Sequence, residues 1–336
     1  SDLMRITNQE QPTHPIYHYA FVVDAVEGLI LVNVDTFADL EPRNNNLERA
    51  LTWNEGGILR GARHITIGGH YLYIAADAGL VILNVDDPMK PKVARVVSAP
   101  GVRASALQFR YLFVSDATGL RVIDVTVPEA ARLLSSPGSV VPLGHAQRIY
   151  LARTYAYVAN GGDGLAIVDI ERPELPRLYQ MFNAEGALND ARDVVVASTN
   201  ASLFAYVADG RNGLKVLQLT SPASQPKFYG FSPEPKPQLI AWRATASPAL
   251  SLSKGLDRDR AVDETGGQIA IVGRIGARPF TLEEMRKMYL RPDGTTWTVS
   301  DAVDAPNFRP AQGQDPSRGS RAVRGPGAKP QEASRK

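Results

Sequence analysis

Apolar residues recur along this chain in pairs of short runs, and each pair is joined by a glycine-containing turn. In five copies a run that opens with an aromatic residue is followed by a Gly-Leu step and a second apolar run. Aromatic and β-branched side chains fill both runs at nearly every position, which is typical of strands covered on both faces. The copies span residues 19–35, 71–86, 111–125, 155–170 and 204–219.

These copies form a repeat array because their Gly-Leu steps recur at similar intervals. The glycines are Gly28, Gly79, Gly119, Gly164 and Gly213, which lie 51, 40, 45 and 49 residues apart. Such periods are typical of propeller blades, small antiparallel sheets that bury their faces against their neighbours. We therefore predict an all-β fold, a β-propeller of about six blades with five clear repeats and a degenerate one.

Beyond residue 235 the regularity weakens. A glycine turn and apolar run within residues 263–272, together with the run at 238–242, predict the degenerate sixth blade. Thr281 is a good N-cap for a helix over residues 281–290, which we expect to cap the last blade, with partner binding as the alternative. The predicted domains are a propeller over residues 1–300 (clear repeats 15–230, degenerate blade and capping helix 238–300) and an extended Pro/Gly/Arg-rich tail over 301–336.

The second apolar runs carry a family resemblance. They read LVILNV at residues 80–85, LRVIDV at 120–125 and LAIVDI at 165–170, each after a strand that opens Tyr-x-Tyr or Tyr-x-Phe. Over about residues 15–230 the chain resembles the LVIVD-repeat family of bacterial and archaeal surface or exported proteins. Asn33, Asn84 and Gln218 depart from the repeat aspartate. The resemblance implies a β-propeller and an exported location, and it implies no catalytic residues.

Composition narrows the functional classes. The 37 basic and 35 acidic residues leave a net charge of +2, which gives no reason to propose a nucleic-acid-binding surface. The absence of cysteine excludes disulfides, thiolate zinc sites and covalently attached haem. No stretch approaches the roughly 20 apolar residues of a membrane helix, so no membrane span is predicted. The chain shows no signal peptide and begins with Ser, which suggests processing; we expect an exported protein at the cell surface or in the periplasm.

A second regularity lies upstream of the hairpins. Arg63, Arg103 and Arg148 each precede their Gly-Leu glycine by 16 residues, and Arg192 precedes its glycine by 21. Each opens a short apolar run that would be the innermost strand of a propeller blade, beside the central channel. We expect these arginines, with Arg260 in a fifth equivalent position, around one mouth of the channel.

Two interpretations of this arginine set remain open. Converging guanidinium groups are suited to an anion or carboxylate site. Alternatively, each arginine pairs with an acid of its own or the next blade and locks the blades together, which is the more common use of buried charge. The acids available for pairing are Asp24, Asp77, Asp116, Asp190, Asp193 and Asp209.

Other catalytic chemistry is sparse. We predict no metal site and no cofactor, since His14 and His18 flank a proline and residues 256–264 lack the ligand pattern of a calcium loop. No nucleophile elbow or phosphate loop is present. An enzyme is therefore the less favoured class, although propeller active sites can be assembled from scattered loops.

The tail provides candidate partner-binding residues. Residues 305–336 contain seven basic and two acidic residues and are rich in Pro, Gly and Ser, a composition that does not fold alone. We expect it to lie on its own propeller, on a neighbouring copy of this chain or on another protein, and other subunits or copies of the chain are the predicted partners. The candidate contacts are Arg309, Arg318, Arg321 and Arg324.

These observations favour a non-enzymatic, exported β-propeller that acts as a scaffold or protein-interaction subunit of a larger assembly. A cell-surface filament or an electron-transfer complex is the specific variant, with multihaem cytochromes as one class of partner. The alternative is a propeller enzyme or small-anion binder that uses an arginine-lined channel mouth.

Overall fold

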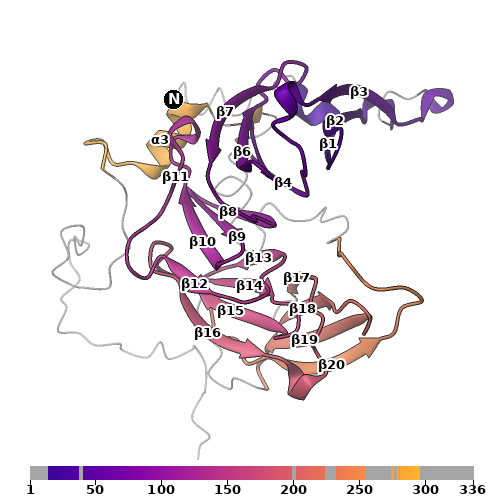
Figure 1. The fold of residues 1–336 in the computed structure, drawn as a ribbon, viewed down its shortest axis with the longest axis vertical. Helices are drawn as coiled ribbons and strands as arrows, with labels where there is room; N and C mark the ends of the chain where they lie inside the picture. The colour runs from indigo at the N-terminus through magenta and orange to yellow at the C-terminus, as the bar shows by residue number, and fades with distance from the viewer. Residues whose placement is uncertain are drawn as a thin grey trace, which may run out of the picture. The chain divides into compact units, whose positions relative to one another are not determined.

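The structure is a computed structural model that describes residues 14–37, 41–198, 202–223, 232–253, 274–275, 278–279 and 281–295. The chain divides into two compact units, Ser1–Thr295 and Thr296–Lys336. All described residues belong to the first unit, so the predicted tail lies outside them. Within the first unit, the described chain is almost entirely β-structure (Figure 1).

Five antiparallel sheets follow one another along the chain, coloured from indigo to orange in Figure 1. The first contains β1 (Tyr19–Asp24), β2 (Gly28–Asn33) and β3 (Glu48–Trp53); the second β4 (His64–Gly68), β5 (Tyr71–Ala76), β6 (Gly79–Asn84) and β7 (Lys92–Val97); the third β8 (Ala104–Gln108), β9 (Tyr111–Ser115), β10 (Gly119–Asp124), β11 (Arg132–Leu133) and β12 (Val140–Pro142). The fourth contains β13 (Ile149–Ala152), β14 (Tyr155–Ala159), β15 (Leu165–Asp169) and β16 (Arg177–Phe182); the fifth β17 (Asp193–Ser198), β18 (Leu203–Ala208), β19 (Leu214–Thr220) and β20 (Gln238–Arg243).

Shorter elements connect and follow the sheets. They are the 3₁₀ turns η1 (Pro15–His18), η2 (Asp35–Phe37), η3 (Pro42–Asn44), η4 (Glu55–Gly57), η5 (Pro128–Ala130) and η6 (Ala184–Gly186), the two-residue strands β21 (Arg274–Ile275) and β22 (Arg278–Pro279), and the helix α3 (Leu282–Tyr289).

The repeated hairpin joins the first and second strands of the first sheet and the two central strands of the sheets that follow. In the second sheet, β5 pairs with β6 from Tyr71 opposite Asn84 to Ala76 opposite Gly79. Gly79 has φ +111°, and a Cβ there would lie 2.5 Å from the carbonyl oxygen of Val97 on the outer strand. The repeat therefore requires glycine at this turn, because a side chain would collide with the neighbouring backbone.

Apolar cores lie between successive sheets. One cluster of buried side chains joins each consecutive pair of the five sheets, so the chain contains four such cores. The central strands β5, β9 and β14 are buried at every position because a neighbouring sheet covers each face. The strands β1 and β18 alternate in burial instead, since their sheets are the first and last of the described array.

The first strands of the sheets lie next to one another. Contacts join β1 to β4, β4 to β8, β8 to β13 and β13 to β17. Stacked antiparallel sheets with adjacent first strands are the arrangement of propeller blades, so the predicted all-β propeller class is confirmed. Five sheets match the five clear copies, and the sixth copy predicted at residues 263–272 lies outside the described residues.

Two assignments near the C-terminus differ from expectation. Residues 238–243, which we placed with the degenerate blade, form β20 and pair with β19 as the outer strand of the fifth sheet. The helix α3 forms with the predicted Thr281 N-cap, in a capping box with Glu284. It does not cap the last described blade, because Thr281 and Leu282 line a cavity together with His70 and Asn84 of the second sheet.

Hydrogen bonds between side chains join adjacent sheets at the start of the second strand. The Tyr71 hydroxyl donates to Glu129 of the third sheet at 2.5 Å, and the Tyr111 hydroxyl donates to Glu174 of the fourth. Burial raises the pKa of both phenols, and the glutamates raise it further, so both remain donors at neutral pH. Each glutamate follows a proline in the segment after its sheet's third strand, and the equivalent positions of the second and fifth sheets hold Met89 and Ala223, so two copies share this contact.

We expect the Tyr111→Phe substitution to lower the free energy of unfolding by about 1 kcal/mol, because it removes a part-buried hydrogen bond to Glu174 and leaves Arg110 as the remaining donor to that carboxylate. The measurement is chemical denaturation followed by circular dichroism. Tyr73→Phe is the matched control, since the Tyr73 hydroxyl is buried without a hydrogen-bond partner among the described residues. Equal losses in the two variants would show that the Tyr111–Glu174 bond contributes nothing specific.

A buried carboxyl occupies the hairpin turn of the fifth sheet. Asp209 follows β18 and is fully buried, and its Oδ1 accepts the Asp190 N–H at 2.7 Å. Burial raises the pKa of Asp209. Asn160 has the equivalent place in the fourth sheet, where its side-chain oxygen accepts the His145 N–H at 3.0 Å. An uncharged asparagine side chain can therefore accept the same backbone hydrogen bond in this turn.

We expect Asp209→Asn to raise the thermal unfolding midpoint at pH 7. A carboxyl whose pKa is raised by folding contributes stability below its unfolded pKa, and this contribution is lost as the pH rises through the folded value. The gain from the substitution should therefore shrink as the pH falls toward 4, which thermal scans at several pH values would measure. A lower midpoint at pH 7 would instead show that the charge has a stabilising partner.

Candidate functional site

The repeated arginines occupy one structural position. Arg63, Arg103, Arg148 and Arg192 directly precede the first strands β4, β8, β13 and β17. Their backbones extend the ladder to the second strand; for example, the Arg103 N–H donates to Ser115 O at 2.8 Å and the Arg192 N–H donates to Ala208 O at 2.8 Å. The sequence spacing therefore identified equivalent residues correctly, because each arginine lies at the same end of the pairing between the first and second strands of its sheet.

Three of these side chains bond to the protein itself. Arg63 donates to Gly61 O at 2.8 Å and to Asp77, and Arg192 lies 2.6 Å from Asp190. Arg103 donates to Ala146 O beside the fourth sheet at 2.7 Å and so connects two blades. These contacts are of the kind that the structural interpretation expects. The anion-site interpretation of the whole set stays a prediction, and Arg260 lies outside the described residues.

A cavity of about 490 Å³ opens between the first strands. It brings together two of the predicted arginines, Arg63 and Arg148, whereas Arg103 and Arg192 do not line it. The remaining lining residues are Val23, His64, Ile65, Ile149, Tyr150, Asp193, Val194, Val195, Ser251 and Leu252. The strands β1, β4, β13 and β17 therefore share one polar cavity.

Asp193 supplies the carboxyl of this cavity. Its oxygens accept the Val194 N–H at 2.8 Å and the Leu252 N–H at 2.9 Å. Burial raises the pKa of Asp193, and these two N–H groups and the positive charge of Arg148 partly oppose that rise. The hydrogen bond to Leu252 also holds residues 251–252 against β17, which completes one wall of the cavity.

His64 is fixed by the neighbouring sheet. The Ser105 N–H of β8 donates to His64 Nδ1 at 3.2 Å, so the neutral ring carries its proton on Nε2. Sequence reasoning did not assign His64 to the cavity. Its place immediately after Arg63 was the available signal, because the residue after each arginine begins the innermost strand.

The remaining candidates of the sequence are placed as follows. The His14 ring accepts the Ile16 N–H at the start of η1, and His18 pairs with Asp35. Within the described ranges, no cluster of three His, Cys, Asp or Glu residues has the geometry of a metal site, and no helix is long and apolar enough to span a membrane. The partner-binding candidates Arg309, Arg318, Arg321 and Arg324 lie outside the described residues.

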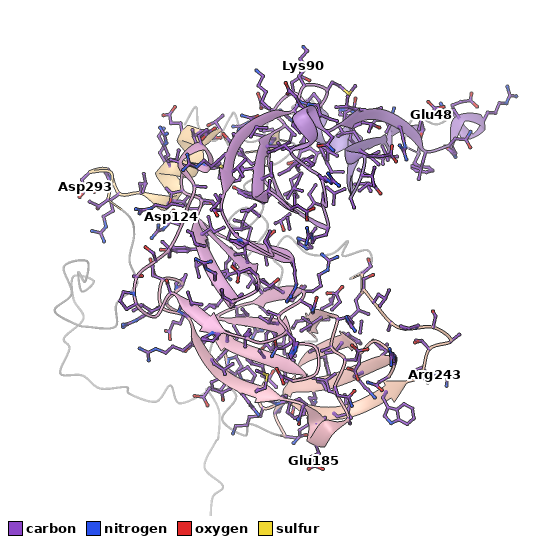
Figure 2. All side chains as sticks on the ribbon, in the orientation of Figure 1. Glu48, Lys90, Asp124, Glu185, Arg243 and Asp293 are labelled. Atoms are coloured by element: carbon purple, nitrogen blue, oxygen red, sulfur yellow. The ribbon has the colours of Figure 1, made fainter. Side chains whose placement is uncertain are left out.

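Exposed apolar side chains gather on the outermost strands. On β20, which ends at Arg243 (labelled in Figure 2), the exposed fractions are 66% for Trp242 and 50% for Ile240. The Lys215 ammonium lies 5.4 Å from the centre of the Trp242 ring. Leu178, Tyr179 and Met181 are exposed on β16, and Val93 and Val96 on β7. The outermost strands β7, β16 and β20 therefore expose apolar side chains to solvent.

Comparison with solved structures finds proteins of low sequence identity. One is titled a putative 6-phosphogluconolactonase from Bacteroides uniformis, with 11% identity, coverage of 68% of both chains and a TM-score of 0.49. Another is the Myceliophteria thermophila Cps50 (Swd1) β-propeller domain, with 12% identity, coverage of 71% of this chain and 75% of that one, and a TM-score of 0.40. The fold assignment therefore rests on the sheets and their packing, and no activity transfers from these titles.

No curated protein matches the chain in sequence. The family model for the LVIVD repeat matches residues 60–97, 143–183 and 190–230. These segments contain the second and fourth sheets and the first three strands of the fifth. The first and third copies lie outside the matches, in sheets that depart from the four-strand pattern. The chain therefore contains LVIVD repeats in these three segments.

Proposed function

We propose that this protein is a non-enzymatic, exported β-propeller that acts as a scaffold or protein-interaction subunit of a larger assembly, such as a cell-surface filament. Its partners are other subunits, with multihaem cytochromes as one class, or further copies of this chain. The resemblance of the repeats to surface and exported proteins supports the location. The exposed apolar edge of the fifth sheet supports the interaction role most directly.

Trp242 and Ile240 are the central residues of this edge. β20 is the outermost strand of its sheet, so within the described structure one side of its backbone has no neighbouring strand. Large apolar side chains that are exposed on such a strand are an aggregation hazard unless a partner covers them. Tryptophan is also among the residues that contribute most binding energy at protein interfaces. The edge therefore has the features of a protein-binding surface.

The basic tail would supply a second contact. Arg309, Arg318, Arg321 and Arg324 alternate with Gly, Ser and Pro, which leaves the guanidinium groups available to carboxylates on a partner. Segments of this composition commonly order when they bind a partner. Crosslinking mass spectrometry of the native preparation would test this contact: crosslinks from residues 305–336 to another chain support the proposal, and crosslinks confined to one chain contradict it.

We expect Trp242→Ser to weaken association with the native partner, or self-association, by about fivefold or more, because removal of a central aromatic anchor costs more than 1 kcal/mol of binding energy. Affinity would be measured by sedimentation or by titration with the partner that crosslinking identifies. Val26→Ser is the matched control, since Val26 is 82% exposed in the turn between β1 and β2, away from β20. Equal affinities of Trp242→Ser and the parent protein would remove the edge from the interface.

A further inference from the structure

Arg148 differs from the other arginines of the repeat position. Arg63, Arg103 and Arg192 each bond to a carboxylate or carbonyl oxygen of the protein. Arg148 is partly buried and lines the 490 Å³ cavity, and its guanidinium group makes no hydrogen bond or ion pair within the described part of the chain. A partly buried guanidinium group without a bonded oxygen forfeits much of its hydration, so it favours an anionic partner.

The surroundings of Arg148 limit which anion fits. Among the residues that the structure describes, Asp193 is the one carboxylate that lines the cavity, and backbone N–H groups of Val194 and Leu252 already bond to its two oxygens. Its negative charge lies near Arg148 and would repel a multiply charged group such as phosphate more strongly than a single carboxylate. The volume is within the usual range of small-molecule pockets, roughly 300–1,000 Å³.

A second donor lines the same cavity. His64 Nδ1 accepts a hydrogen bond from the Ser105 N–H, so the Nε2–H group of the neutral ring can donate to an acceptor in the cavity. His64 and Arg148 come from β4 and from the residue before β13, strands that are not neighbours in the sequence of sheets. A ligand that spans both donors would therefore bridge the second and fourth sheets.

We propose that this cavity binds a small organic carboxylate, with the Arg148 guanidinium group as the principal contact for the anion and the His64 Nε2–H group as a second donor. The site goes beyond the proposed interaction role and does not depend on it. The arginine repeat thus serves both interpretations: Arg63, Arg103 and Arg192 stabilise the fold, and Arg148 is left for the ligand.

Isothermal titration calorimetry of the full chain with butyrate, a monocarboxylate, tests the proposal, with butyramide as the neutral match and inorganic phosphate as the competing anion. We expect butyrate to bind and butyramide not to bind. Arg148→Gln should lower butyrate affinity by about tenfold or more, and His64→Phe should lower it severalfold. Arg192→Gln is the control, because Arg192 has the same repeat position but pairs with Asp190 outside the cavity.

Circular dichroism and thermal scans would establish that each variant is folded before titration. The proposal is overturned if butyrate does not bind the parent protein at millimolar concentration, if phosphate binds more tightly than butyrate, or if folded Arg148→Gln binds butyrate as the parent does. An equal loss in Arg192→Gln would also overturn it, because that result would assign the effect to general surface charge.

Discussion

Burial of both faces of each central strand is the constraint on which this protein depends. A single small sheet exposes two apolar faces, and the only covers large enough are the sheets before and after it. Tyr71, Tyr73, Phe113 and Tyr157 are almost wholly buried in the cores that result. Because successive sheets stack in the same orientation, their first strands lie next to one another. The outermost strands of the sheets lie at the other end of each sheet.

This arrangement explains why the inner and outer edges differ in chemistry. The inner strands bring polar residues from separate repeats into one cavity, as His64, Arg148 and Asp193 show. The outer strands are fixed only on one side and carry exposed apolar groups, Trp242 above all. A stack of sheets with a polar cavity between its first strands and exposed apolar side chains on its outer strands is compatible with both a small ligand in the cavity and a protein partner at the outer strands.

Repetition gives equivalent backbone positions but not equivalent interactions. The four repeated arginines begin the same strand in four sheets, yet their partners come from turns that vary between the copies. Asp77 and Asp190 are acids close to Arg63 and Arg192, whereas Arg103 reaches a backbone carbonyl of the next sheet. The glutamates that bond to Tyr71 and Tyr111 show the opposite case, in which equivalent residues of two copies make the same contact between sheets.

The sequence alone determined the strands, the glycine turns and the repeat class, because alternation of apolar runs and turn residues is a local property that every copy reinforces. It also located the arginine position, which depends only on hairpin length. The cavity, the selection of Arg148 and the place of α3 beside the second sheet were decided by the tertiary structure. Those features depend on which residues from distant segments meet when the sheets stack, and no spacing within a single repeat contains that information.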